Sequence, residues 1–159
     1  MPEPSPDLPN PRDRAIRDPG FLFGLWPWAK GPEWETQDEH HFTLLVPGWT
    51  QLGYRIPVGY RYNKASTPPL LWGPPFNYLP DGLARVPALE HDFLCDLLTG
   101  ASPWLKAHLN GYLPKCPPPQ IVHEHFHRQM LRYGVRKSKA DAWHAAVAMV
   151  GPKGKLRWK

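Results

Sequence analysis

The residues 123–127 read His-Glu-His-Phe-His and contain the pattern H-E-x-x-H. On a helix, positions i and i+4 lie on one face, so the side chains of His123 and His127 could bind one zinc ion while Glu124 polarises the attacking water. This chemistry is that of a zinc-dependent hydrolase, which would act on a peptide or on cell-wall material.

A catalytic zinc site also needs a third protein ligand and an open coordination position. Three side chains could supply that ligand, namely His91, Asp141 and His144. However, Arg128 directly follows the second histidine of the pattern, and the chain holds 8 histidines, so an accidental match is easy. The simpler interpretation is a polar, solvated helix face that needs no cofactor. We expect this arrangement, and the Zn²⁺ site is its alternative.

The adjacent pair His91 and Asp92 is the second candidate for chemistry, because a polar turn containing Asn63 and Ser66 lies upstream of it. In one arrangement, Asn63, Ser66 and Asp92 form a buried hydrogen-bond network that fixes the turn against the helices, since buried polar groups must be paired. In the other, the same residues line a catalytic pocket with His91 as the acid–base group. Because Asn63 can act neither as a base nor as an anionic ligand, we expect the structural network.

The order of these motifs resembles a phage and prophage family, domain-of-unknown-function family 1353. Its signature is a Val-Pro-x-Gly-Phe strand, then Asp-x-Ala-Ser-x-Pro, a His-Asp doublet on a helix, a later Ala-Asp, and a glycine that ends a helix. The matching segments here are 56–60, 63–68, 91–92 and Gly134. Asn63 stands where the family has Asp, and His123-Glu124 stands where it has Ala-Asp.

The resemblance covers about residues 42–152 and implies a small phage protein, either part of the particle or encoded beside structural or lysis genes. We therefore expect a virion-associated structural or interaction protein, such as a head–tail, tail or baseplate component. Its partners would be other virion proteins in a homo- or hetero-oligomeric assembly, and it would reside in the virion after assembly in the host cytoplasm. The zinc-dependent, lysis-associated hydrolase is the alternative.

The N-terminal segment 1–34 supports the expected role in assembly. The chain has 22 prolines in 159 residues, many of them in this segment. Residues 1–20 contain little apolar surface and should be disordered when alone. Trp26, Trp28 and Trp34 could anchor a neighbouring subunit, or they could form a strap over the core of their own chain. We expect an extended arm that wraps a neighbouring subunit.

The elements that must position the candidate residues begin with strands. Residues 41–47 read as one strand, and residues 51–62 alternate between apolar and polar, which is typical of a half-buried strand. A Gly-Trp-Thr turn at 48–50 should join the two as a hairpin. The side chains expected to point inward are Leu52, Tyr54, Ile56, Val58, Tyr60 and Tyr62.

From residue 86 onward the apolar spacing becomes helical. Helices are predicted at residues 86–98, 104–109, 120–133 and 139–150. Ser138 is the expected N-cap of the last helix. The buried stripe of the third helix should consist of Val122, Phe126, Met130 and Tyr133.

The sequence thus predicts a small α+β fold, with an antiparallel hairpin or sheet followed by three or four helices. The domain should span residues 35–152 with an insertion at 99–119, and residues 153–159 should form a basic tail. The net charge of +5 would suit an acidic partner, but motifs that read or stack bases are missing, so we do not expect nucleic acid. No apolar run reaches about eighteen residues, so no membrane span is expected.

Overall fold

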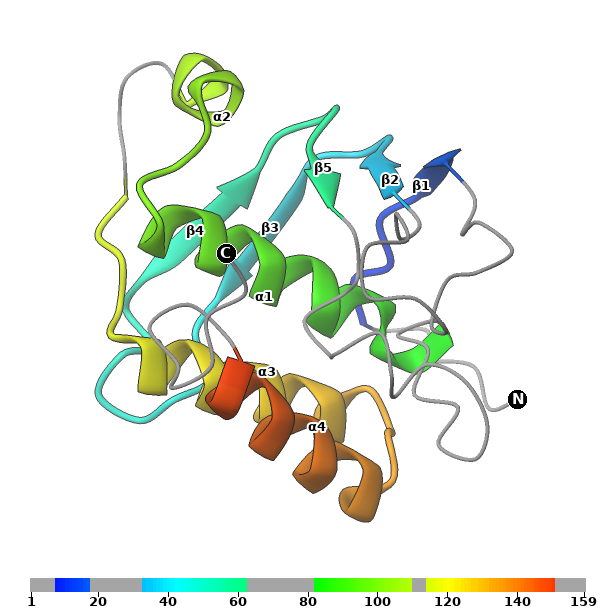
Figure 1. The fold of residues 1–159 in the computed structure, drawn as a ribbon, viewed down its shortest axis with the longest axis vertical. Helices are drawn as coiled ribbons and strands as arrows, with labels where there is room; N and C mark the ends of the chain where they lie inside the picture. Colours follow the sequence, from blue (N-terminus) through cyan, green and yellow to red (C-terminus); the bar gives the residue numbers. More distant parts are fainter. Residues whose placement is uncertain (1–7, 18–32, 63–81, 110–113, 151–159) are drawn as a thin grey trace.

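The computed structural model describes residues 8–17, 33–62, 82–109 and 114–150. These residues form five strands, then a short 3₁₀ helix, η2 (Gly82–Ala84), and four α-helices (Figure 1). The predicted α+β class is therefore confirmed. None of the helices in the described ranges is long and apolar enough to cross a lipid bilayer.

The first sheet is antiparallel, with the order β1-β2-β5. It consists of β1 (Asp13–Arg17), β2 (Glu33–Thr36) and β5 (Arg61–Tyr62). The backbone of Trp34 pairs with that of Tyr62, and the Trp34 side chain packs against the core. Trp34 is thus a strap residue of its own domain rather than an exposed anchor.

The predicted boundary between arm and domain at residue 34 is wrong for the described part of the arm. Besides the pairing of β1 with β2, polar contacts from Arg85 and Tyr133 bind this segment to the helices. Arg85 donates from Nη1 to the carbonyl of Pro11 at 2.7 Å and pairs with Asp13 at 3.0 Å. The hydroxyl of Tyr133 donates to the carbonyl of Pro9 at 2.6 Å. Trp26 and Trp28 lie outside the described residues, as does the basic tail 153–159.

The second sheet is the predicted hairpin, formed by β3 (His40–Thr43) and β4 (Gly53–Ile56). Phe42 lies opposite Tyr54, and the strands alternate between buried and exposed side chains. The turn between the strands contains Gly48, whose φ of 82° suits a residue without a Cβ atom. The hairpin is therefore confirmed.

The single strand predicted over 51–62 is divided by a turn that starts at Pro57. Proline cannot donate to a strand ladder, so β4 ends before it. Thr36 holds the turn: its Oγ1 donates to the carbonyl of Pro57 at 2.9 Å and accepts from the N–H of Tyr60 at 3.0 Å. The chain then enters β5 in the other sheet. Val58, expected to point inward, lies at the turn and is 53% exposed.

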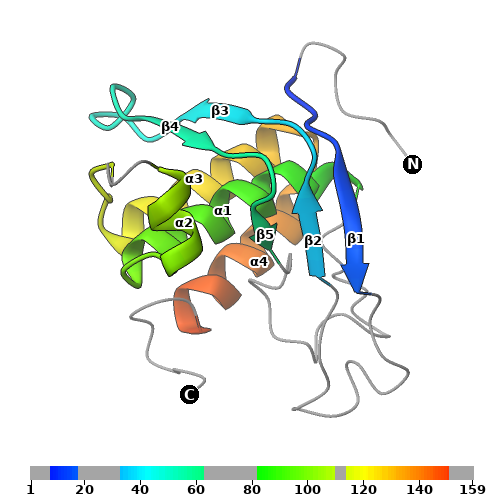
Figure 2. The ribbon, with the colours of Figure 1, turned by 90° about the horizontal axis from the view of Figure 1, so that it is seen from above.

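The helices are α1 (Arg85–Leu98), α2 (Pro103–His108), α3 (Pro119–Arg132) and α4 (Lys137–Val150). Helices α1 and α3 lie side by side below the strands, and α4 packs on the far side of α3 (Figures 1 and 2). Helix α4 begins at Lys137, so Ser138 lies in its first turn instead of capping it.

Two apolar clusters hold these layers together. One lies between the strands and α1 and includes Phe42, Ile56 and Phe93. The other lies among α1, α3 and α4 and includes Phe126 and Trp143. The predicted stripe of α3 is buried along its whole length. Leu105 and Leu109, from the predicted insertion 99–119, belong to the first cluster, so this segment is part of the core.

Candidate active site

A buried carboxylate lies where the strands meet α1 and α3. Glu90, on α1, is only 1% exposed, and three donors surround its two oxygens. His40 Nε2 lies 2.7 Å from Oε1, while His125 Nε2 and Gln129 Nε2 lie 2.8 Å and 2.6 Å from Oε2. His40 comes from β3, and the other two partners lie one turn apart on α3. Three separate elements therefore converge on one carboxylate.

The protonation state of His125 follows from its other ring nitrogen. Nδ1 accepts a hydrogen bond from the backbone N–H of Leu45 at 3.1 Å, so this nitrogen carries no proton. The proton of the neutral ring must then be on Nε2, which donates to Glu90. Since a charged imidazole has a proton on both nitrogens, His125 is held in its neutral form.

His40 differs from His125 in this respect, because its Nδ1 makes no hydrogen bond within the described residues. Burial alone would raise the pKa of Glu90, but the hydrogen bonds from His125 and His40 outweigh burial and hold that pKa below its ordinary value. Glu90 is therefore ionised at neutral pH. Among its three partners, His40 is the one side chain that can carry a balancing positive charge.

Gln129 is 2% exposed, and within the described residues only the nitrogen of its side-chain amide forms a hydrogen bond. Its Nε2 must face Glu90, because an ionised carboxylate can only accept. This fixes the orientation of the amide and leaves Oε1 buried, with no donor among the described residues. A buried acceptor without a partner costs about 1–3 kcal/mol. Such a group is often explained by a ligand or an ordered water.

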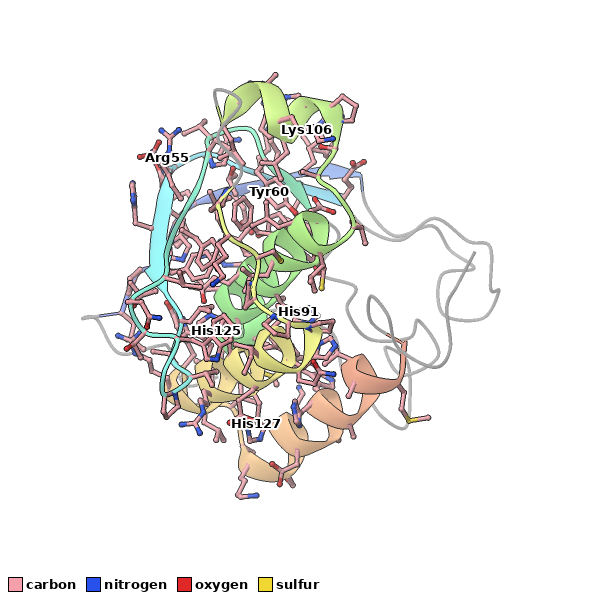
Figure 3. All side chains as sticks on the ribbon, turned by 90° about the vertical axis from the view of Figure 1, so that its left-hand side faces the viewer. Arg55, Tyr60, His91, Lys106, His125 and His127 are labelled. Carbon is pink, nitrogen blue, oxygen red and sulfur yellow. The ribbon has the colours of Figure 1, made fainter. Side chains whose placement is uncertain are left out.

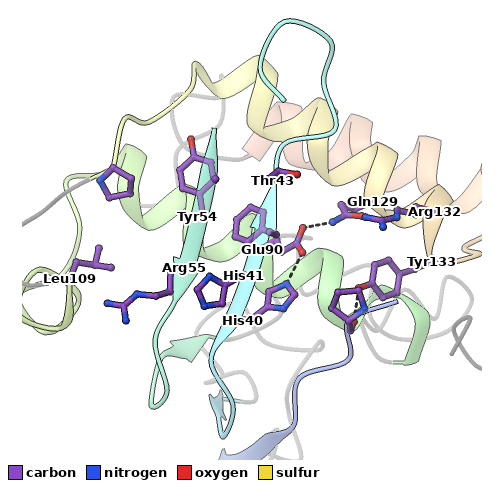
Figure 4. A pocket seen from close by; sticks show the side chains of 14 residues that line it. His40, His41, Thr43, Tyr54, Arg55, Glu90, Leu109, Gln129, Arg132 and Tyr133 are labelled. Atoms are coloured by element: carbon purple, nitrogen blue, oxygen red, sulfur yellow. Dashed lines mark hydrogen bonds and ion pairs between the residues drawn. The ribbon is translucent and has the colours of Figure 1, made fainter. Parts of the chain in front are cut away.

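Glu90, His40 and Gln129 line a pocket of about 640 Å³ between the β3–β4 hairpin and α3 (Figure 4). In this view Glu90 lies between His40 and Gln129, and the dashed lines mark two of its hydrogen bonds. The exposed side chains of His41, Arg55 and Arg132 also line the pocket. The volume is in the range of roughly 300–1,000 Å³ that is usual for small-molecule sites.

A second cluster joins residues from the two motifs that the sequence suggested. His91 Nε2 lies 3.1 Å from His123 Nδ1, and Cys95 Sγ lies 3.7 Å from the His91 ring. His123 is 5% exposed, so the prediction of a solvated helix face is wrong for this residue. Figure 3 shows His91 and His125 between α1 and α3, and His127 on the side of α3 that faces α4.

His123 and His127 have different partners, although they are four positions apart. His127 Nε2 bonds to Asp141 at 2.7 Å, and its ring lies 5.0 Å from that of His144. Glu124 pairs with Arg128 at 2.7 Å instead of facing either histidine. Within the described ranges, no group of three His, Cys, Asp or Glu side chains could hold a metal ion. The third ligand that the zinc hypothesis requires is thus not supplied there.

The network predicted around the upstream turn stays a prediction. Asn63 and Ser66 lie outside the described residues, and Asp92 is half-buried on α1. His91, by contrast, is buried. Burial is the larger cause, and the nearby His123 the smaller one, that lower the pKa of His91 well below its ordinary value. A ring whose pKa is strongly lowered is poorly suited to the acid–base role considered for His91.

Sequence reasoning missed the carboxylate site entirely. Glu90 stands within the apolar run of α1, where an unpaired carboxylate would be costly, so its position was the available signal. His125 was overlooked because it is the middle histidine of the zinc-like pattern. His40 and Gln129 carried no signal of their own, since only the folded chain brings them to Glu90.

Comparisons with protein-family models, with curated proteins and with solved structures found no match for this chain. The resemblance to the phage family therefore stays a prediction, and the geometry of the pocket carries the functional argument.

Proposed function

We propose that the protein is a hydrolase that cleaves an amide by general acid–base catalysis in the pocket above Glu90. The observation that supports this is the pair of His40 and Glu90, in which the carboxylate holds Nε2 and leaves Nδ1 without a partner in the described residues. A carboxylate–imidazole pair is a common way to orient a catalytic histidine and to stabilise its charged form.

In the proposed reaction, a water molecule gives a proton to Nδ1 of His40 while its oxygen attacks the carbonyl carbon of the amide. The C–N bond then breaks, and His40 returns the proton to the leaving nitrogen. One water is consumed, and the products are a carboxylic acid and an amine. Glu90 keeps the Nε2 proton in place throughout, so it is a positioning residue. His125 and Gln129 fix the carboxylate in turn.

The test is turnover of N-acetylated di- and tripeptides, followed by mass spectrometry of the products. The protein should release an amine product, and His40→Asn should reduce the rate at least 100-fold, the lower end of what acid–base catalysis contributes. His41→Asn is the matched control, because this neighbouring histidine is exposed at the same pocket. A folded His40→Asn protein with the wild-type rate, or no turnover by the wild type, would contradict the proposal.

We also propose a role in a phage particle as a second candidate, because the described part of the chain contains an open sheet edge. Strand β1 is an edge strand, and Ile16 on it is 36% exposed. An exposed edge strand can pair with a strand of another protein. Ile16→Lys should then lower the amount of this protein in purified particles, and unchanged incorporation would exclude β1 as the contact. Deleting residues 1–20, by contrast, would also remove β1 from the fold.

A further inference from the structure

The pocket is lined by groups of opposite charge. The ionised carboxylate of Glu90 lies buried at the inner end, whereas Arg132 on α3 is exposed and also lines the pocket. A ligand that fits this field places a hydrogen-bond donor inward and an anionic group outward. Complementarity of this kind fixes the orientation of a ligand more than it raises affinity.

The inner end offers a specific acceptor for that donor. Gln129 lines the pocket, and its buried Oε1 accepts no hydrogen bond from the described residues. The two oxygens of Glu90 are already engaged by three donors. A ligand N–H that bonds to Gln129 Oε1 would remove the cost of the unpaired acceptor, and this gain is available only to a ligand with a donor at that position.

The exposed basic side chains that line the pocket differ in their partners. Arg55 and His41 both contact the carboxylate of Glu39, at 3.0 Å and 2.6 Å, so each already has an anionic partner. Arg132 forms no ion pair with a carboxylate among the described residues. Its planar guanidinium can bind a carboxylate through two parallel hydrogen bonds. Arg132 is therefore the side chain that is available for an anionic group of the ligand.

We infer that the pocket binds the C-terminal residue of a peptide, with its amide N–H on Gln129 Oε1 and its carboxylate on Arg132. Gln129 and Arg132 are three positions apart on α3, and such residues are neighbours on a helix surface. A C-terminal residue carries an N–H and a carboxylate on the same Cα atom, so one short group can reach both. This inference rests on the proposed function and makes the protein a carboxypeptidase, since the amide held by Gln129 is the one His40 would cleave.

Binding of defined probes by calorimetry tests the inference without relying on turnover. The reference probe is N-acetyl-alanyl-alanine, as its L,L and D,D isomers. Two altered probes each lack one feature of the reference probe. Its C-terminal amide has no carboxylate charge, and N-acetyl-alanyl-N-methylalanine has no N–H on the amide of the C-terminal residue. We expect each altered probe to bind at least tenfold more weakly than the preferred isomer of the reference probe.

Two arginine variants test whether Arg132 is the side chain that binds the carboxylate of the ligand. Arg132→Gln should remove the preference for the free acid over the amide. Arg128→Gln removes the same charge one turn away on α3, but Arg128 binds Glu124 and does not line the pocket, so the preference should persist. Equal binding of acid and amide, no binding of either isomer, or equal loss in both variants would overturn the inference.

The two proposals fail in different ways. His40→Asn should abolish turnover and keep the preference for the free acid. If the wild type binds the acid selectively but never cleaves it, the inference about the ligand stands and the hydrolase proposal falls. If the peptides are cleaved in a His40-dependent manner with no preference for a free C-terminus, the hydrolase stands and the inference falls.

Discussion

His91 Nε2 and His123 Nδ1 lie 3.1 Å apart at the contact between α1 and α3, and the ring of Phe126 lies 4.7 Å from that of His91. Both histidines are buried. Burial, and then the nearby His144, lower the pKa of His123 to about 4. Burial also lowers the pKa of His91. The pair is therefore neutral at pH 7, and one ring donates its N–H to the other.

This pair predicts a loss of stability in mild acid. In the unfolded chain a histidine binds a proton near pH 6.5, whereas folded His123 does so near pH 4. Between these values the unfolded state binds more protons, so the free energy of unfolding falls as the pH decreases. The shift of His123 corresponds to roughly 3 kcal/mol once the pH is below both pKa values. Urea unfolding between pH 7.5 and pH 4, at roughly half-unit steps, measures this slope.

Variants separate the histidine effect from that of carboxyl groups. His123→Gln should flatten the slope between about pH 6.5 and pH 4, whatever its stability at neutral pH. Glu90 also loses its stabilising charge in acid, but only as the pH falls through its lowered pKa. An unchanged slope in His123→Gln would show that the pair does not titrate as described.

Cys95 should be a slow nucleophile despite its contact with His91. Burial, and then the charges of Asp92 and Asp96, raise the pKa of the thiol, and the neutral imidazole cannot stabilise a thiolate. Because the thiolate is the reactive form, iodoacetamide at pH 7.5 should alkylate Cys95 at least tenfold more slowly than free cysteine. Peptide mass spectrometry measures the rate, and the chain in urea is the control. Alkylation as fast as in urea would contradict the raised pKa.

Local periodicity was sufficient to predict the β3–β4 hairpin and the four helices. The alternation around Tyr54 and Ile56 fixed the buried face of the hairpin, and the spacing of Val122, Phe126 and Met130 fixed that of α3. Such patterns work because the side chains of one element share one face.

Polar contacts between distant segments could not be predicted in this way. The bond from Glu90 to His40 spans 50 positions and that to His125 spans 35, so no local pattern encodes the carboxylate site. The N-terminal strand shows the same limit. Its composition indicates disorder, yet β1 is fixed by its ladder with β2 and by Asp13, whose partner Arg85 comes from α1.

Asp13 should therefore contribute more to stability than its place in the arm suggests. Its carboxylate binds Arg85 Nη1 at 3.0 Å and accepts from the hydroxyl of Tyr62, and the Asp13 and Arg85 side chains are largely buried. Asp13→Ala leaves a cation and a hydroxyl without this partner and should lower the free energy of unfolding by roughly 2–4 kcal/mol. Arg14→Ala in the same strand removes an ion pair in which Arg14 is largely exposed and Glu35 keeps Arg61 as a partner, so it should cost less than about 1 kcal/mol. Equal losses in denaturant unfolding would contradict this ranking.

Glu90 provides the strictest test of the buried site, because its two closest replacements should behave differently. In Glu90→Gln the new Oε1 can accept from His125 and Gln129, while the new NH₂ donates to His40, which can move its proton to Nδ1. His125 has no such freedom, because the N–H of Leu45 occupies its Nδ1. We expect a loss of about 1 kcal/mol, typical of exchanging a charged hydrogen bond for a neutral one.

Glu90→Leu has a similar size but accepts nothing, so it leaves three buried donors unpaired. Each unpaired group costs about 1–3 kcal/mol, and the sum approaches the whole stability of a small domain. We expect this variant to be unfolded or close to it at 25 °C, whereas Glu90→Gln retains its near-UV circular dichroism and a cooperative transition. A stable Glu90→Leu protein would mean that the three donors have alternative partners, and the argument for an ionised, positioned Glu90 would then fail.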